Sequence, residues 1–274
     1  MIIDLSRMLN KMVKLVIHPK TFVDDISSYA RQRRIVKAAG SAFFLQSQMD
    51  INSKSNWYAA ELVRQVGGYL IPDDSVDRLV EDLEPWDVVR RDMIILLLRS
   101  VLERKVDGDL AELGVYKGQT ARLIHHYIPE RQLHLFDTFS GFDSSDVAME
   151  SIAVGSNRNM AQFADTSVSE VLRRIQYRNN NVKIYPGYFP RTVPADLENQ
   201  RFAFVHLDAD LYEPTKAGLS FFCERMSRGG IVLVHDYNAW LGARKAVDEF
   251  CRGSNYVALP MPDKSGSTVL VNCS

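Results

Sequence analysis

The sequence has few cysteines, no long apolar run and no apparent signal sequence. Its three cysteines, Cys223, Cys251 and Cys273, form no Cys-x-x-Cys pair. This argues against a structural zinc site or a disulfide framework and suits a reducing compartment. The best apolar run, residues 93–98, is far shorter than the about 20 residues that span a bilayer. Charged residues interrupt any apolar N-terminal core. We therefore expect a cytoplasmic protein without a transmembrane segment.

The chain also lacks the net charge that would indicate a charged partner. Its 274 residues carry a formal net charge of -1, which gives no general attraction to nucleic acid or anionic membranes. Hydrophobic residues make up 46% and charged residues 24%, as is usual for globular proteins. The length fits one large domain, or a domain with an appendage. We expect a small molecule, not a nucleic acid, as the partner.

Residues 1–56 differ from the rest in being basic. Here Leu5, Met8, Leu9 and Met12 recur at helical spacing, which predicts an amphipathic helix. A basic amphipathic helix can lie on a membrane surface, but more often it packs on its own domain or on another subunit. We therefore predict a basic helical N-terminal extension over 1–56, a second domain over 57–274, and a homo-oligomer.

From residue 110 onward, short apolar runs alternate with helical segments. The expected strands are 110–113, 133–136, 182–185, 202–207, 231–234, 257–259 and 268–271, and the expected helices are 120–127, 167–178, 215–226 and 242–251. This alternation predicts an α/β protein with a doubly wound, mostly parallel sheet. The last two strands are expected to form an antiparallel hairpin. Arg228-Gly229-Gly230 is expected to stop the helix that ends at 226.

One connection, residues 138–166, is unusually long and rich in Ser, Asp, Asn and Gly. We expect it to be structureless. Long loops of this kind in compact domains are usually lids or disordered segments. Because this one follows the carboxyl end of a strand, we expect it to cover a ligand; a mobile insertion is the alternative.

Two of the predicted strands, 202–207 and 231–234, are followed by groups that can bind metals: Asp208, Asp210, His235 and Asp236. Ligands of open α/β sheets bind beyond the carboxyl ends of the strands, so these groups are expected at one edge. They either cap the following helices or bind a hard divalent cation such as Mg²⁺. The imidazole suits a softer metal better. His206 lies within its strand and is expected to be a hydrogen-bonded core residue.

A glycine-containing turn follows the first predicted strand. It reads Glu112-Leu-Gly114-Val-Tyr116-Lys-Gly118-Gln-Thr120. Its glycines and the exposed amides of the next helix suit a polar or anionic ligand group. It is not the dinucleotide fingerprint Gly-x-Gly-x-x-Gly, which counts against a nicotinamide-dependent dehydrogenase. A plain strand–helix connection is the other interpretation.

An acid and an aromatic turn accompany the glycine turn. Asp137 ends the second predicted strand, about twenty residues further on, where an acid can bind a ribose hydroxyl pair. After the third strand, Gly187, Tyr188 and Phe189 offer backbone contacts and an aromatic wall to a nucleobase. A proline–glycine turn with core aromatics explains the same residues. The turn and the acid together predict an adenosine-type cofactor.

Taken together, these motifs resemble the macrocin O-methyltransferase (TylF/MycF) family of S-adenosylmethionine-dependent enzymes. The resemblance runs from about residue 69 to the C-terminus and is carried by residues 107–118, 136–142, 186–190, 206–216, 235–237 and 243–250. It implies a class I methyltransferase (Rossmann-like) fold. It also implies magnesium-dependent methylation of a hydroxyl on a small-molecule or glycan acceptor, typically a sugar of a secondary metabolite.

Carried over by position, the resemblance implies a role for each motif. The methionine moiety of the cofactor would be held by Glu112, Gly114, Tyr116, Gly118 and Thr120, the ribose by Asp137, and the adenine by Gly187, Tyr188 and Phe189. The metal would be bound by Asp208, His235 and Asp236. Asp208 and Asp210 would serve catalysis, with Asp210 as general base.

One position departs from the family pattern. Relatives of known metal dependence often have Asp-Asp-Tyr where this chain has His235-Asp236-Tyr237. An imidazole in place of a carboxylate should weaken magnesium affinity or change the metal preference. The alternatives to O-methylation of a sugar or glycosylated metabolite are a different acceptor, a non-catalytic relative and, least favoured, the dehydrogenase.

Overall fold

The computed structural model of this chain describes residues 88–175 and 181–273. These residues form a seven-stranded sheet in the order β3-β2-β1-β4-β5-β7-β6. Neighbouring strands from β3 to β5 run parallel, whereas β7 runs antiparallel to β5 and to β6. The predicted doubly wound, mostly parallel sheet and its C-terminal antiparallel hairpin are therefore confirmed.

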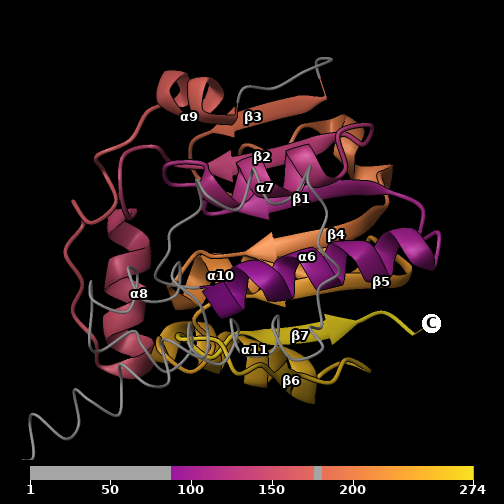
Figure 1. Ribbon diagram of the computed structural model, residues 1–274. Coiled ribbons are helices and arrows are strands. Elements are labelled where there is room, and N and C mark those ends of the chain that lie inside the picture. The colour runs from indigo at the N-terminus through magenta and orange to yellow at the C-terminus, as the bar shows by residue number, and fades with distance from the viewer. Residues whose placement is uncertain (1–87, 176–180, 274) are drawn as a thin grey trace, which may run out of the picture. The chain divides into compact units, whose positions relative to one another are not determined.

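The strands are β1 (Asp109–Leu113), β2 (Leu133–Asp137), β3 (Val182–Pro186), β4 (Phe202–Leu207), β5 (Met226–Val234), β6 (Leu259–Pro260) and β7 (Thr268–Val271). The helices are α6 (Val88–Glu103), α7 (Gln119–Tyr127), α8 (Ser144–Val154), α9 (Val168–Ile175), the 3-10 helix η1 (Ala195–Asn199), α10 (Tyr212–Cys223) and α11 (Leu241–Arg252). Helices α6 and α7 cover one face of the sheet, α10 and α11 cover the other, and α8 stands beyond the carboxyl ends of the parallel strands (Figure 1).

The sheet is held by a core on both of its faces. Every residue of β4 is buried, as expected for a parallel strand covered by helices on both sides. On the side of α10, Phe222 packs against Phe136, Phe189 and Phe202 with ring centroids 5.2–6.0 Å apart. Each fully buried aromatic ring contributes roughly 1.5–3 kcal/mol through its removal from water. This packing holds α10 and the turn at Phe189 against β2 and β4.

The prediction of a structureless segment over 138–166 was wrong, because the segment contains α8. Asp143 caps this helix, and its carboxylate accepts a hydrogen bond from the amide of Ser145 at 2.8 Å. Gly155 ends the helix with a left-handed φ of 69°. The Ser and Asp residues that suggested a loop are those that satisfy the free amides at a helix start.

The helix predicted over 215–226 is present as α10, but its bounds differ and the predicted stop at Arg228-Gly229-Gly230 was wrong. Helix α10 begins at Tyr212 and ends at Cys223, and Arg228-Gly229-Gly230 lies inside β5. The pairing of β4 with β5 shifts register between Phe202 and Phe204, and Gly229 has a φ of 80°. The glycines therefore accommodate an irregular stretch of β5, where extra residues are inserted opposite β4 and Gly229 adopts a left-handed backbone.

The predicted N-terminal extension over 1–56, its boundary with 57–274 and its subunit contact lie outside the described residues and stay predictions. In the part of the chain that the structure describes, no helix combines the length and the apolar character needed to cross a bilayer. The predicted helix over 167–178 is present as α9 up to Ile175.

The strand order reverses between β1 and β4, and a crevice opens there between their carboxyl ends, as in other open α/β sheets. In this crevice the amide of Asp208 donates to the carbonyl of Leu113 at 2.8 Å. Gly114, with a φ of 88°, lies so close that a Cβ atom would collide with the carbonyl oxygen of Asp208. The turn after β1 and the end of β4 can meet only because residue 114 is glycine.

We expect Gly114→Ala to destabilise the protein more than Gly155→Ala does. Both glycines have positive φ, which costs alanine about 1–2 kcal/mol. A Cβ on Gly155 would meet nothing within 4 Å, whereas the collision at Gly114 adds an overpacking cost of about 1–3 kcal/mol. Urea unfolding followed by circular dichroism measures both variants. Equal losses would contradict the close contact.

Candidate active site

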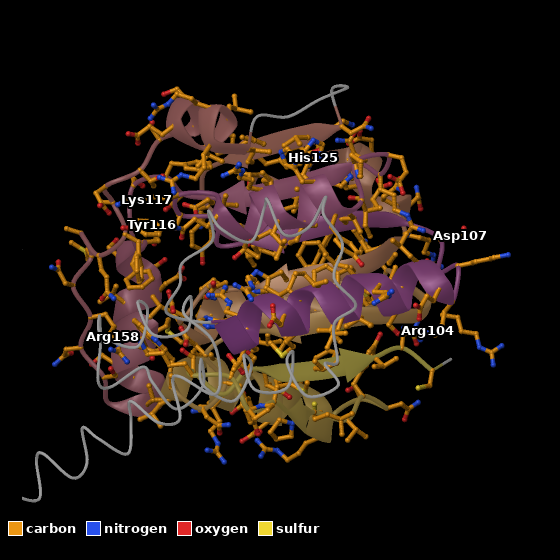
Figure 2. All side chains as sticks on the ribbon, in the orientation of Figure 1. Arg104, Asp107, Tyr116, Lys117, His125 and Arg158 are labelled. Atoms are coloured by element: carbon orange, nitrogen blue, oxygen red, sulfur yellow. The ribbon has the colours of Figure 1, made fainter. Side chains whose placement is uncertain are left out.

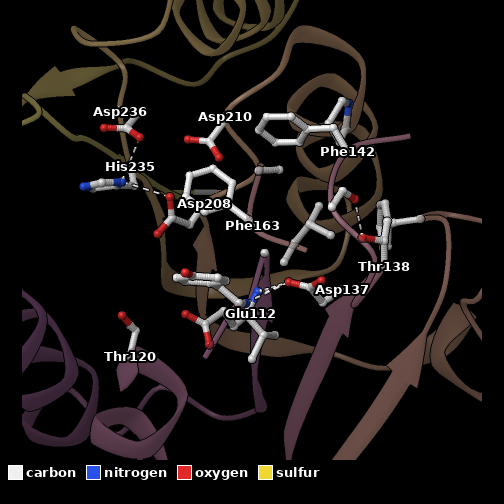
Figure 3. Close-up of a pocket in the computed structure, with 18 of the residues that line it drawn as sticks. Glu112, Thr120, Asp137, Thr138, Phe142, Phe163, Asp208, Asp210, His235 and Asp236 are labelled. Atoms are coloured by element: carbon white, nitrogen blue, oxygen red, sulfur yellow. Dashed lines mark hydrogen bonds and ion pairs between the residues drawn. The ribbon is translucent and has the colours of Figure 1, made fainter. Parts of the chain in front are cut away.

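A cavity of about 340 Å³ lies at the crevice between β1 and β4. It brings together all of the predicted site residues except Gly118, which precedes α7. Those that line it are Glu112, Gly114, Tyr116, Thr120, Asp137, Gly187, Tyr188, Phe189, Asp208, Asp210, His235 and Asp236. In Figure 3 the acid cluster of β4 and β5 lies on one side and Asp137 on the other, with Phe142 and Phe163 beside the space between them.

Asp137 supports the glycine turn from the end of β2. Its Oδ2 accepts hydrogen bonds from the amides of Val115 and Tyr116 at 2.7 and 2.8 Å, and its Oδ1 accepts from the amide of Phe139 at 2.7 Å. An ionised carboxylate can accept about four hydrogen bonds, so one position remains for a ligand hydroxyl. Asp137 thus shapes the turn and can still contact a ribose.

The turn after β3 contributes a wall and a link to α8. The hydroxyl of Tyr188 donates to Asp146 at 2.8 Å, and burial raises the pKa of Asp146 to about 6. The ring of Phe189 is 4% exposed and stacks on Phe222 at 5.7 Å. Most of this ring therefore belongs to the core, and Gly187 and Tyr188 offer the more open part of the wall.

Asp208 lies between two nitrogen donors. Nη2 of Arg90 donates to its Oδ2 at 2.6 Å, and Nδ1 of His235 lies 2.9 Å from its Oδ1. Burial alone would raise the pKa of Asp208, but His235 and Arg90 hold it well below its usual range. Burial alone would lower the pKa of His235, but Asp208 and a hydrogen bond to Asp236 raise it to about 10. Asp208 is therefore ionised and doubly paired.

Asp210 and Asp236 form a second acidic pair in the cavity. Each adopts a left-handed φ of 59°, a conformation that Asp tolerates better than most residues. Burial, the Asp208 carboxylate and a hydrogen bond to Asp236 hold the pKa of Asp210 well above its ordinary value. His235 keeps the pKa of Asp236 below its ordinary value despite burial. Asp210 is the carboxyl group of this cluster that holds a proton most readily.

Glu112 and His206 meet in the buried floor of the site. Nδ1 of His206 lies 2.9 Å from Oε1 of Glu112, and its Nε2 accepts from Nη2 of Arg90 at 3.2 Å. His206 is 0% exposed, in keeping with the expected hydrogen-bonded core residue. Oε2 of Glu112 is buried and has no hydrogen-bond partner among the described residues. Because Glu112 lines the cavity, this oxygen is available to a ligand.

The predicted metal ligands Asp208, His235 and Asp236 place their ligand atoms within 4.8 Å of one another. As arranged, however, they do not fit a divalent cation. Nδ1 of His235 faces oxygens of Asp208 and Asp236 at 2.9 and 3.3 Å, and carboxylates accept hydrogen bonds, so this nitrogen carries a proton and presents no lone pair. The other oxygen of Asp208 is taken by Arg90.

The segment 138–166 covers one side of the cavity and is fastened at several points. The carboxylate of Asp165 accepts from the Tyr116 hydroxyl at 2.8 Å and from Lys117 at 2.6 Å. Glu150 on α8 is 0% exposed and accepts from the amide of Tyr212 at 2.9 Å. These contacts tie the segment to the glycine turn and to α10, so it forms a fixed wall.

Sequence reasoning missed several lining residues: Arg90, Thr138, Phe142, Asp143, Asp146, Phe163 and Pro214. Most lie in the segment mistaken for a structureless loop. Little in the sequence points to Arg90, which is a basic residue beside an apolar run in the segment before the first strand.

The family model of macrocin O-methyltransferase (TylF) matches residues 89–269. The chain belongs to the macrocin O-methyltransferase family. This is a family of O-methyltransferases, so the predicted family and enzyme class are confirmed, and the dehydrogenase alternative is not supported.

Two relatives similar to this chain are named as O-methyltransferases. The chain is 31% identical over 193 residues to the 8-demethyl-8-(2,3-dimethoxy-alpha-L-rhamnosyl)-tetracenomycin-C 4'-O-methyltransferase of Streptomyces olivaceus, covering 66% of this chain and 71% of the relative. It is 32% identical over 177 residues to the demethyldecarbamoylnovobiocin O-methyltransferase of Streptomyces niveus, covering 60% of this chain and 65% of the relative. The chain thus spans about two thirds of the length of these relatives.

Solved structures share the fold. The O-methyltransferase NovP aligns with a TM-score of 0.57 at 24% identity, covering 68% of this chain and 80% of NovP. The calicheamicin methyltransferase CalS11 aligns with a TM-score of 0.59 at 24% identity, covering 80% of this chain and 91% of CalS11. At this identity the likeness concerns the fold, and it confirms the predicted class I methyltransferase architecture.

We expect Asp137→Asn to lower the free energy of unfolding by about 1–3 kcal/mol, since an amide nitrogen in place of one carboxylate oxygen leaves buried N–H groups without an acceptor. Asp107→Asn is the matched control. Asp107 is exposed and lies at the end of the domain opposite Tyr116 and Lys117 (Figure 2). Urea unfolding compares the two variants. Equal stability of both would show that Asp137 does not support the turn.

Proposed function

We propose that this chain transfers the methyl group of S-adenosylmethionine to a hydroxyl of a sugar or glycosylated small molecule. The observation that carries the proposal is the contact between the turn at Gly114 and the end of β4 at Asp208. It places the groups suited to the methyl donor and the acids suited to the acceptor in one cavity. The relative from Streptomyces olivaceus, whose name gives a rhamnosyl-bearing tetracenomycin as its substrate, supports this acceptor class.

The donor side is the part of the cavity between Glu112, Asp137 and Tyr188. S-adenosylmethionine supplies a methyl group already activated by its sulfonium. The unpaired Oε2 of Glu112 can accept a hydrogen bond from the ammonium group, and the open position on Asp137 can accept one from a ribose hydroxyl. Holding both reactants in line can lower the barrier by as much as about 7–11 kcal/mol.

The acceptor side is the acid cluster. The acceptor oxygen forms a bond to the methyl carbon, the carbon–sulfur bond breaks with its electrons remaining on sulfur, and the hydroxyl proton passes to a carboxylate. We assign the base to Asp210, because a carboxylate whose pKa is raised is a stronger proton acceptor than one whose pKa is depressed, as that of Asp208 is. Asp208, held by Arg90 and His235, orients the acceptor. The resemblance implied magnesium assistance, but no step here uses it.

Binding experiments on the full chain test the donor. We expect S-adenosylhomocysteine to bind in calorimetry and to raise the melting temperature, because ligand binding to the folded state stabilises it. NAD is expected to do neither. A mass-spectrometric screen of glycosides for a methyl gain then tests the acceptor. Binding of NAD but not of S-adenosylhomocysteine would overturn the proposal. Binding of S-adenosylhomocysteine without methylation of any glycoside would favour another acceptor or a non-catalytic relative.

We expect Asp210→Asn to lower kcat/KM for methyl transfer by about 10²–10⁴-fold, the usual contribution of a general base. Affinity for S-adenosylhomocysteine should be unchanged, because Asp210 lies on the acceptor side. Asp107→Asn serves again as the remote control and should keep full activity. Activity of Asp210→Asn close to that of the control would assign proton removal to another group.

A further inference from the structure

Arg90 contributes a charge to the acid cluster from a helix remote in sequence. It lies on α6, and its guanidinium donates to Oδ2 of Asp208 at 2.6 Å across 118 positions of the chain. The side chains of Arg90 and Asp208 are 19% and 21% exposed, so the pair is largely shielded from water. A guanidinium keeps its charge at any physiological pH. One oxygen of Asp208 therefore has a permanent cation as its partner.

His235 occupies the other oxygen of Asp208. Its Nδ1 lies 2.9 Å from Oδ1 of Asp208 and 3.3 Å from Oδ2 of Asp236 (Figure 3). Whether the ring is neutral or charged, this nitrogen presents an N–H between two carboxylates. These three residues are the group whose side chains could together bind a cation, so the N–H of His235 points at the two acids that such a cation would need.

A divalent cation would have to displace both donors. It would need the lone pair of Nδ1, which is protonated, and it would add two positive charges beside the guanidinium of Arg90. Mg²⁺ prefers oxygen ligands and gives up its waters reluctantly, so a nitrogen ligand and a nearby guanidinium both weigh against it. Instead, the carboxylate of Asp208 is already neutralised by Arg90 and His235.

We infer that Arg90 and His235 take the place of a divalent cation in this enzyme, and that methyl transfer by this chain requires no metal. Arg90 is then a positioning residue that acts on the acceptor through Asp208. The statement about methyl transfer rests on the proposed function. The statement about metal binding does not, and it can be tested without substrate.

Titration of the full chain with Mn²⁺, followed by the electron paramagnetic resonance of the free ion, tests the inference. The proteins compared are the wild type, His235→Asp, and the double variant Arg90→Gln/His235→Asp. The control is Arg99→Gln/His235→Asp, which removes an arginine of the same helix that pairs with Glu103 at the surface. Circular dichroism establishes that each variant is folded.

We expect no Mn²⁺ binding by the wild type at millimolar concentration, and binding by His235→Asp. The double variant should bind Mn²⁺ about 10–100-fold more tightly than His235→Asp, the usual range for a group that governs a metal site through its ligands. The Arg99 control should bind like His235→Asp. Binding of Mn²⁺ by the wild type within tenfold of His235→Asp would overturn the inference. If the double variant does not fold, this comparison of wild type with His235→Asp decides.

A second readout separates this inference from the proposed function. Calorimetry with S-adenosylhomocysteine, in EDTA, reports on the donor site alone. Loss of that binding in the wild type would overturn the proposed function and leave the Mn²⁺ result standing. Once an acceptor is identified, methyl transfer by the wild type should continue in the presence of EDTA. Loss of activity in EDTA that Mg²⁺ restores would overturn the inference.

Discussion

The contact between the turn after β1 and the end of β4 is the constraint on which the site depends. Gly114 lies against the carbonyl of Asp208 where no side chain would fit, at the point where the strand order reverses. This contact brings the groups proposed for the methyl donor and for the acceptor within one cavity. Asp137 maintains the same turn from the other side by accepting hydrogen bonds from two of its backbone amides.

A cluster of carboxylates at such a place must be neutralised, because an unpaired buried charge is costly. The chain does this with its own residues. Arg90 and His235 neutralise Asp208, and burial beside Asp208 and Asp236 raises the pKa of Asp210. We propose different roles for these two acids, because the pKa of Asp210 is raised whereas the carboxylate of Asp208 is held by two partners.

The wall that closes the cavity is held by buried polar contacts. Glu150 accepts from the amide of Tyr212 in a fully buried position, and Asp146 accepts from Tyr188 at the turn after β3. Helix α8 is thereby tied to both halves of the sheet. Because a buried hydrogen bond is expensive to break, the wall has a defined position from which Phe142 and Phe163 can meet a ligand.

The sequence by itself determined the sheet and most of the site. Buried strands are recognisable from local apolar runs, and the parallel topology brings their carboxyl ends to one edge, so Asp137, Asp208 and Asp236 could be placed together before any coordinates were known. The family motifs added the enzyme class. Helix α8 and the strand segment at Gly229 were misplaced, because serine, aspartate and glycine occur in loops, helix caps and irregular strands alike. Only the neighbouring strands and helices select among these.

Only the tertiary structure decided how the acids are paired. Arg90 and Asp208 lie 118 positions apart, and no local pattern records which charge meets which carboxylate. The orientation of the His235 ring, with Nδ1 toward Asp208 and Asp236, also follows from packing and not from spacing. Residue types in the sequence therefore identify groups that could bind a metal. Whether they do depends on long-range electrostatics, which exists only once the chain has folded.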